Sequence, residues 1–182
     1  MDDDSGWNDV LLGLWSTAVR DAVVTRIEAA TVGRRGWLVR VFAAPERARS
    51  GLTETVHALV LAAIRDETGA DLDALGSQAA WECYEQVWDA LGARWSGGGG
   101  TVAVPLGREP EVVRALAALP VEAAVCAGAD LDPSGGVDPL WLGGRLRVDD
   151  EGLRAYLAGG MGAVPHGARD GVRRILAVLS AG

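Results

Sequence analysis

The sequence contains no lysine, so all 17 of its basic residues are arginines. Without lysine the chain cannot form a Schiff base through a side-chain amine, and it cannot supply the lysine of a phosphate-binding P-loop. The arginines are scattered and outnumbered by 25 acidic residues, which gives a net charge of −8 at pH 7. Because such a chain repels a phosphate backbone, nucleic acid is not an expected partner.

Cysteine and long apolar runs are also scarce. Cys83 and Cys126 are the only cysteines and lie far apart, which favours two buried thiols in a reducing compartment over a disulfide framework. The chain starts with Met-Asp-Asp-Asp, unlike the cationic start of a secretory signal, and its apolar runs are too short to span a membrane. We therefore expect a soluble cytoplasmic protein without membrane insertion.

Tryptophan is abundant instead, with seven residues against one phenylalanine. Three of them lie in residues 81–95, where aromatic and leucine residues recur at alternating steps of three and four: Trp81, Tyr84, Trp88, Leu91 and Trp95. This spacing predicts an amphipathic helix, and its length of about two heptads is typical of an internal core helix rather than a coiled coil. We expect two of the three tryptophans to be buried against Leu11, Leu14 and Leu59, with the third available to a partner.

Hydrophobic spacing predicts the remaining elements. Helices are expected at residues 5–20, 53–66, 110–119, 150–158 and 169–179, and strands at residues 37–43, 101–104, 121–126 and 143–148. Residues 22–32 fit either a continuation of the first helix or a strand paired with residues 37–43. Residues 101–126 predict a right-handed βαβ unit.

These elements predict an α+β or α/β fold. Its N-terminal half should be helical with a β-hairpin or single strand, and a small βαβ-containing sheet and a C-terminal helix should follow. We expect a single domain over residues 1–182. The glycine run at 97–100 marks a boundary within it between a mainly helical lobe, 1–96, and an α/β lobe, 101–182.

One acidic segment has the ligand spacing of a calcium-binding loop. Its candidate oxygen ligands are Asp130, Asp132, Ser134 and Asp138. Trp141 occupies the position where such a loop needs a bidentate glutamate, and Pro133 lies inside the loop. These departures favour an acidic turn, so we expect no metal site.

His166 is the best candidate for acid or base catalysis, because it follows Pro165 in a glycine-rich loop and loops often present reactive groups. Its potential partners are the carboxylates Asp149 and Asp150 and the thiol of Cys126. The sequence contains no G-x-S-x-G, H-E-x-x-H or C-x-x-C motif and no signature of a cofactor site, so no cofactor is expected. A small acid/base or thiol enzyme is therefore the alternative function rather than the leading one.

The second half contains an ordered series of short motifs. They are a predicted strand at 101–104, a helix at 111–119, a strand at 121–125, Gly135-Gly136-Val137, Gly144-Arg145-Leu146, Val148-Asp149 and a helix at 153–157. In this order, residues 101–157 resemble the C-terminal globular domain of the E-type peripheral-stalk proteins of V- and A-type ATPases, and of the related flagellar and type III export stator proteins. The resemblance implies a non-catalytic assembly subunit that binds a larger ATPase.

The leading hypothesis is a non-catalytic protein that binds a protein partner, or another copy of itself, through an aromatic surface. Tryptophan is enriched among the residues that anchor protein interfaces. The candidate partner-binding residues are Trp7, Trp15, Trp88 and Trp141.

Overall fold

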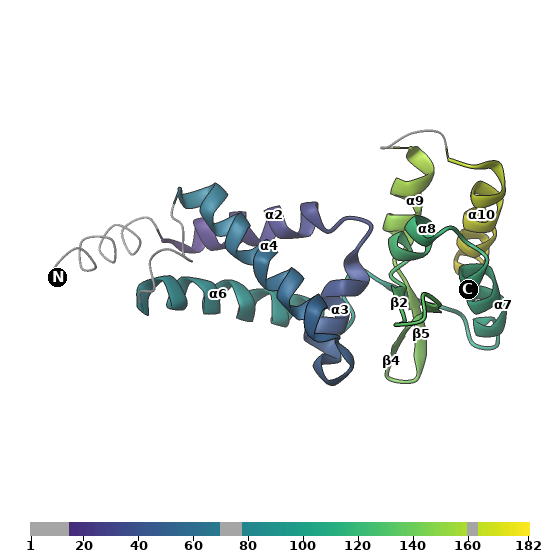
Figure 1. Cartoon of the computed structure of the whole chain (residues 1–182), viewed down its shortest axis with the longest axis horizontal. Coiled ribbons are helices and arrows are strands. Elements are labelled where there is room, and N and C mark those ends of the chain that lie inside the picture. The colour runs from purple at the N-terminus through teal and green to yellow at the C-terminus, as the bar shows by residue number, and fades with distance from the viewer. Residues whose placement is uncertain (1–14, 70–77, 160–163) are drawn as a thin grey trace. The chain divides into compact units, whose positions relative to one another are not determined.

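The computed structural model describes residues 15–69, 78–159 and 164–182 (Figure 1). In this part of the chain there are eight α-helices, one short 3-10 helix, η1 (Pro45–Arg47), and five short strands. The strands form a three-stranded and a two-stranded sheet, both antiparallel. The fold is mixed α+β with a helical N-terminal half, as the sequence predicts. No helix among the described residues is long and apolar enough to cross a membrane.

The chain divides into two compact units. The first contains the described residues up to Ala30 together with residues 48–94, and the second contains residues 31–47 and 95–182. The second unit is therefore built from both halves of the sequence. The predicted lobes, 1–96 and 101–182, did not anticipate that residues 31–47 group with the C-terminal half.

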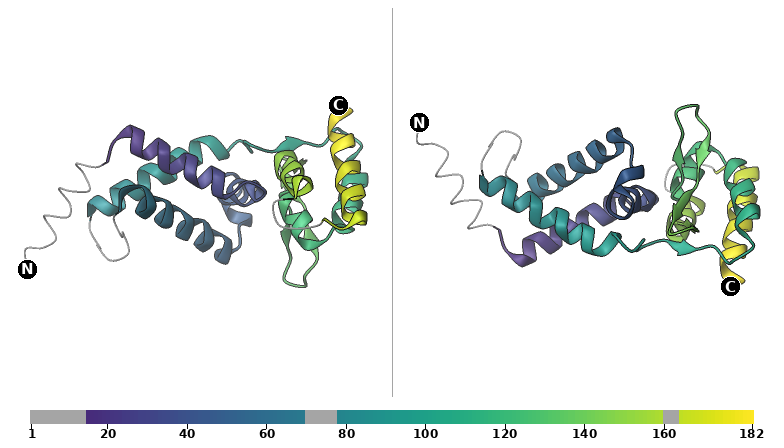
Figure 2. Two further views of the ribbon diagram at one scale, coloured as in Figure 1. Left: turned by 90° about the horizontal axis from the view of Figure 1, so that it is seen from above. Right: turned by 90° about the horizontal axis from the view of Figure 1, so that it is seen from below.

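The described residues of the first unit form three helices, α2 (Thr17–Ala30), α4 (Ser50–Thr68) and α6 (Gln78–Trp95). Helices α2 and α4 lie side by side, as Figure 1 and both views of Figure 2 show. Each helix buries residues spaced three or four apart, which form one apolar stripe. These residues are Val23, Val24 and Ile27 on α2, Val56, Val60 and Ile64 on α4, and Val87 and Leu91 on α6.

Two predictions about this unit are settled by the helix ends. Helix α2 continues to Ala30, so residues 22–30 are helical and the strand alternative was wrong. Helix α4 ends at Gly69 as predicted, because this glycine adopts a φ of +72° and its N–H donates to the carbonyl of Arg65. A left-handed residue that returns its N–H to the last turn is a common helix end, and glycine adopts it without strain.

The predicted strand at residues 37–43 is wrong, because this segment forms helix α3 (Arg35–Ala43). Its β-branched and aromatic composition favours a strand only weakly, and tertiary packing overrides such preferences. Gly36 allows α3 to approach the backbone of Gly128 so closely that a Cβ at this position would lie 2.2 Å from the Gly128 carbonyl oxygen. The apolar side chains of Leu38 and Val39 are fully buried. No strand precedes residue 102 in the described part of the chain.

The predicted strand at residues 121–126 is also wrong, because it is helix α8 (Val121–Cys126). Pro120 precedes the helix, and Ala123 and Ala124 are fully buried. Alanine has the strongest helix preference and lets a helix pack closely against its neighbours. The predicted βαβ unit is therefore absent, and every strand pairing among the described residues is antiparallel.

The sheets of the second unit are small. Strand β5 (Arg145–Val148) is central in the three-stranded sheet, between β1 (Val102–Ala103) and β4 (Leu140–Leu142). In this sheet Val102 faces Val148 and Trp141 faces Leu146. Strands β2 (Asp130–Leu131) and β3 (Val137–Asp138) form a separate hairpin. The expected strands at 101–104 and 143–148 are thus confirmed with shorter bounds.

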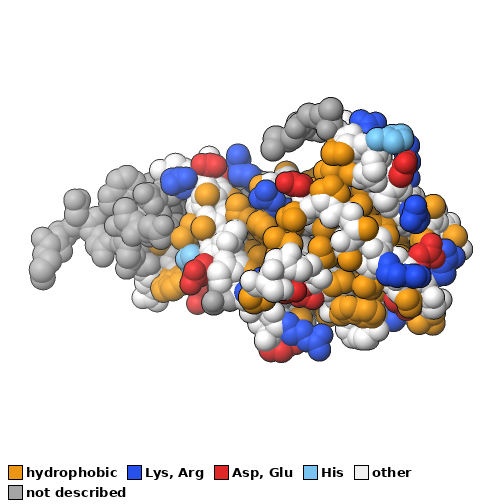
Figure 3. Space-filling model, turned by 45° about the vertical axis from the view of Figure 1, so that its right-hand side comes forward, with side chains coloured by type: hydrophobic (Ala, Val, Ile, Leu, Met, Phe, Trp, Pro, Cys, Tyr) orange, Lys and Arg blue, Asp and Glu red, His pale blue; other side chains and the backbone are white. Residues whose placement is uncertain are grey.

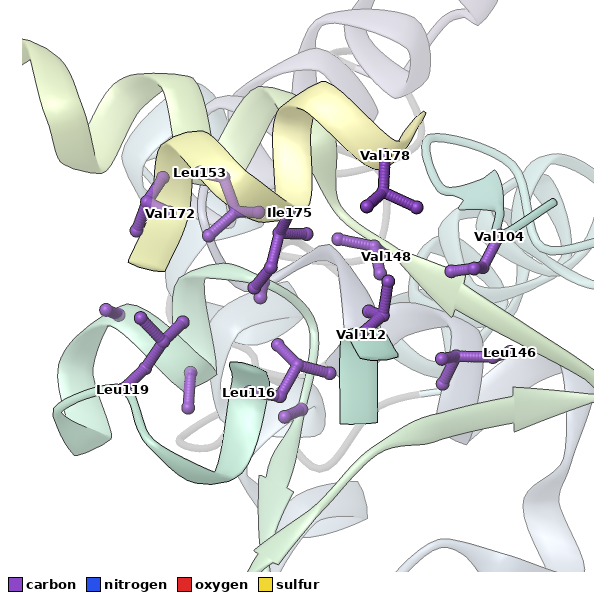
Figure 4. Packing of buried hydrophobic residues seen from close by; sticks show 14 residues of the cluster. Val104, Val112, Leu116, Leu119, Leu146, Val148, Leu153, Val172, Ile175 and Val178 are labelled. Atoms are coloured by element: carbon purple, nitrogen blue, oxygen red, sulfur yellow. The ribbon is translucent and has the colours of Figure 1, made fainter. Parts of the chain in front are cut away.

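The core of the second unit lies between this sheet and four helices. Besides α8 these are α7 (Glu109–Ala117), α9 (Asp150–Ala158) and α10 (His166–Ser180), which confirm the helices predicted at 110–119, 150–158 and 169–179. Figure 4 shows their apolar side chains pointing toward one another and toward the strands. The labelled members of this core are Val104, Val112, Leu116, Leu119, Leu146, Val148, Leu153, Val172, Ile175 and Val178.

Candidate functional site

Trp81 has the most exposed tryptophan side chain in the described part of the chain, at 59%. The buried stripe of α6 runs through Ala80, Cys83, Tyr84, Val87, Leu91 and Trp95. It is therefore rotated by part of a turn from the predicted apolar face, which consists of Trp81, Tyr84, Trp88, Leu91 and Trp95. Of the three tryptophans on α6, only Trp95 is buried. Trp88 is half-buried, and Trp81 lies at the solvent-facing side of the stripe.

The rotation could have been found in the sequence. Cys83 and Val87 are apolar, and each directly precedes a residue of the predicted apolar face, Tyr84 and Trp88. When all apolar residues are weighed, rather than the aromatic ones alone, the stripe moves toward Val87 and away from Trp81. The sequence interpretation gave the large aromatic rings too much weight, so it missed Trp81 as a surface residue.

Trp81 is the exposed end of a group of rings that we call the aromatic stack, formed by His57, Trp81, Tyr84 and Trp88. The ring centroid of Tyr84 lies 5.2 Å from that of Trp81, 5.5 Å from that of Trp88 and 4.8 Å from that of His57 on α4. The rings of Tyr84 and Trp88 are inclined by 24° and stack, whereas Trp81 is tilted by 55° against Tyr84. Offset and tilted pairs at these distances are favourable because of the ring quadrupoles.

The inner part of the aromatic stack is fixed by burial and a hydrogen bond. Tyr84 is only 8% exposed, and its hydroxyl shares a hydrogen bond of 2.8 Å with Nδ1 of His57. Burial raises the pKa of the Tyr84 hydroxyl to about 12, so the phenol is neutral near pH 7. Trp81 therefore packs on a buried, neutral phenol ring that a hydrogen bond to His57 holds in place.

The other candidate tryptophans have different surroundings. Trp7 lies outside the described residues. Trp15 is half-buried, and its indole N–H donates to Oε1 of Gln86 on α6 at 2.7 Å. Trp141, on the edge strand β4 of the second unit, is 37% exposed. Figure 3 shows that hydrophobic side chains reach the surface at several places on the face drawn, bordered by charged ones.

The structure does not bring His166 together with its proposed partners. The side chain of His166 is 91% exposed at the start of α10, and its Nε2 lies 3.7 Å from Asp170. Asp149, in contrast, is completely buried. A side chain as exposed as His166 does not reach a fully buried carboxylate. Asp150 pairs instead with Arg154, at 3.5 Å.

Asp149 and Cys126 lie close together in the second unit. The backbone N–H of Asp149 donates to the carbonyl of Ala127, and the pKa of the Cys126 thiol is raised mainly by burial and further by the charge of Asp149. Arg34 acts in the opposite direction on this thiol, but burial dominates. A thiol with a raised pKa is mostly protonated at neutral pH and is a poor nucleophile.

Asp149 has a structural use. Its Oδ1 accepts from the N–H of Gly152 at 2.8 Å, which caps α9, and its Oδ2 accepts from the N–H of Arg35 at 3.3 Å, at the start of α3. Because the carboxylate is buried, its pKa is raised to about 6 despite these two hydrogen bonds and the neighbouring Arg35 guanidinium. This carboxylate joins two helices that are far apart in the sequence.

The acidic segment is a hairpin connection between β2 and β3. Oδ1 of Asp132 accepts from the N–H of Ser134 at 2.7 Å, from its hydroxyl at 2.5 Å, and from the N–H of Gly136 at 2.9 Å. Asp138 forms an ion pair of 3.3 Å with the buried Arg40 of α3. Oδ1 of Asp130 accepts from the N–H of Leu131. In the described residues, no group of three or more His, Cys, Asp or Glu side chains is arranged to hold a metal ion.

No family model matches this chain, and neither the curated proteins nor the solved structures include a significant match.

Proposed function

We propose that this protein is a non-catalytic interaction or assembly subunit that binds a protein partner through the aromatic stack, with Trp81 as the anchor. The observation that carries this proposal is the 59% exposure of Trp81 on top of the buried Tyr84. Covering a side chain of this size at about 25 cal/mol per Å² stabilises a complex by roughly 2 to 4 kcal/mol.

The support beneath Trp81 makes it a better anchor than an isolated surface tryptophan. Because Tyr84 and His57 share a hydrogen bond and Tyr84 packs against Trp88, the rings below Trp81 are already ordered. A side chain that is ordered before binding loses less conformational entropy in the complex. Aromatic residues with such support are typical of the few positions that dominate binding energy.

Trp81 serves as the anchor in place of Trp15 and Trp88, because it is exposed whereas both of those side chains are half-buried. Trp88 contributes as part of the support beneath Trp81. Trp141 keeps its place as a second candidate contact because it is exposed on an edge strand. A larger ATPase as the partner, which the resemblance implies, stays a prediction.

The alternative of an enzyme centred on His166 receives no support from the side chains around it. Its only ion pair among the described residues is with the exposed Asp170. Cys126, the candidate nucleophile, has a raised pKa.

Site-specific photo-crosslinking tests the proposed function. A benzoylphenylalanine residue in place of Trp81, in cells that make the full chain natively, should give one discrete cross-linked protein. The control carries the same photoreactive residue in place of Leu106, which is 76% exposed in the second unit. A discrete adduct from position 106 and none from position 81 would refute the aromatic stack as the binding surface.

A further inference from the structure

The exposed side of α6 carries acidic residues next to Trp81. Glu82, Glu85 and Asp89 are all exposed, and Glu85 and Asp89 follow Trp81 at steps of four residues. Side chains four apart lie on the same face of a helix. We call Trp81, Glu82, Glu85 and Asp89 the acidic face of α6.

This face has no cationic side chain of its own. Arg94 is the only basic residue on α6, and it pairs with Glu28 of α2 at 2.7 Å. Neither Glu85 nor Asp89 forms an ion pair with any described residue. Among the described residues, Glu82 accepts a side-chain hydrogen bond only from Gln78, at 3.2 Å. Like charges three or four residues apart each destabilise a helix by a few tenths of a kcal/mol. A bound cation relieves this repulsion.

We infer that the partner recognised by Trp81 presents an arginine-rich or lysine-rich protein segment, which binds along the acidic face of α6. This inference rests on the proposed function, because it names the chemistry of the partner at the same surface. A guanidinium or ammonium group over the exposed indole gains a cation–π interaction, and the three carboxylates supply ion pairs beside it. The net charge of −8 attracts such a segment from a distance.

A peptide pair separates charge from shape. The probe is a fluorescein-labelled twelve-residue peptide of alternating arginine and alanine, and its control replaces each arginine with citrulline, which has the same shape without the charge. Fluorescence anisotropy with the full-length protein should show at least tenfold tighter binding of the arginine peptide at low salt. The preference should fall as salt is added, because salt screens exposed charges.

Matched variants locate the binding surface. Trp81→Leu should weaken binding of the arginine peptide about fivefold, the usual effect of losing an exposed cation–π contact. Leu106→Ala, at an exposed apolar residue of the second unit that has no place in the proposed binding surface, should leave it unchanged. The double variant Glu85→Gln, Asp89→Asn should weaken binding more than Glu46→Gln, Glu109→Gln, which removes the same charge from the second unit.

The outcomes distinguish this inference from the proposed function. If both peptides bind equally and Trp81→Leu weakens both, the aromatic surface stands and the basic partner is refuted. If the arginine peptide binds all variants equally, its attraction is only to the net charge, and the acidic face is refuted as the site. If the arginine peptide does not bind while Trp81 still cross-links a partner in cells, the basic partner is again refuted.

Discussion

The buried carboxylate of Asp149 accepts a hydrogen bond from the backbone N–H of Arg35, which lies 114 residues earlier in the sequence. The same carboxylate caps α9 through Gly152. Arg35 also forms an ion pair with Glu151 in the first turn of α9. These contacts join α3 to the C-terminal helices and make residues 31–47 part of the second unit.

At pH 4, where the contribution of Asp149 is largest, Asp149→Ala should lower the free energy of unfolding by about 3 kcal/mol. The variant loses a helix cap, worth about 1 kcal/mol, and leaves two backbone N–H groups without their acceptor. Urea denaturation followed by circular dichroism measures the change. Asp150→Ala is the matched control, since Asp150 forms only an ion pair with Arg154, and its effect should stay below about 1 kcal/mol. Equal losses in both variants would contradict the role given to Asp149.

The titration of Asp149 should contribute to the pH dependence of the free energy of unfolding. Because burial raises the pKa of Asp149 from 3.8 to about 6, the folded chain holds this proton where the unfolded chain has released it. The contribution of Asp149 to the free energy of unfolding therefore falls as the pH rises from about 4 to about 6, by up to about 3 kcal/mol.

This dependence is measured as the difference between the wild-type chain and Asp149→Asn, which cancels the titration of the other carboxylates. The difference should change in favour of the variant between pH 4 and pH 6. A change in favour of the wild type over this range would mean that the folded state prefers the ionised carboxylate.

Gly36→Ala should destabilise the second unit by more than about 2 kcal/mol. A Cβ at position 36 would lie 2.2 Å from the carbonyl oxygen of Gly128, so the backbone of α3 would have to move away. Gly51→Ala is the control, because nothing lies within 4 Å of a Cβ there and the residue is in α4. That variant should be neutral or more stable by about 0.5 kcal/mol, as for glycine to alanine in a helix. An equal shift of the unfolding temperature in Gly36→Ala and Gly51→Ala would contradict the close approach of α3 to the backbone of Gly128.

Truncation of two tryptophans of α6 should destabilise the fold to very different extents. Trp95, at 4% exposure, should cost about 3 to 5 kcal/mol when changed to alanine, whereas Trp81→Ala should cost less than about 1 kcal/mol. Chemical denaturation of the two variants measures both values. A large loss for Trp81→Ala would place this side chain in the core and remove it as a binding anchor.

Most of the local structure follows from the sequence, because it depends on neighbouring residues. Apolar spacing predicts α4, α6, α7 and α10, and Gly69 marks the end of α4. The failures are the segments that became α3 and α8. No residue of α3 is exposed, so this segment shows neither the helical nor the alternating pattern of a half-exposed one. Helix α8 has only six residues, too few to reveal a helical period.

The sequence indicated the aromatic helix but not which of its rings is exposed. A rotation of the helix by one residue position moves Trp81 from the buried side to the surface. The sequence also placed His166 beside Asp149 and Cys126 as possible catalytic partners, and the fold keeps an exposed histidine apart from a buried carboxylate.

The sequence by itself determined the charge, the absence of lysine chemistry and the positions of most helices, because composition and local spacing fix them. Only the tertiary structure decided that residues 31–47 join the second unit, that Asp149 is buried between α3 and α9, and that Trp81 is exposed. These features depend on which distant segments pack together, and a close approach such as that of Gly36 to Gly128 leaves no local pattern in the chain.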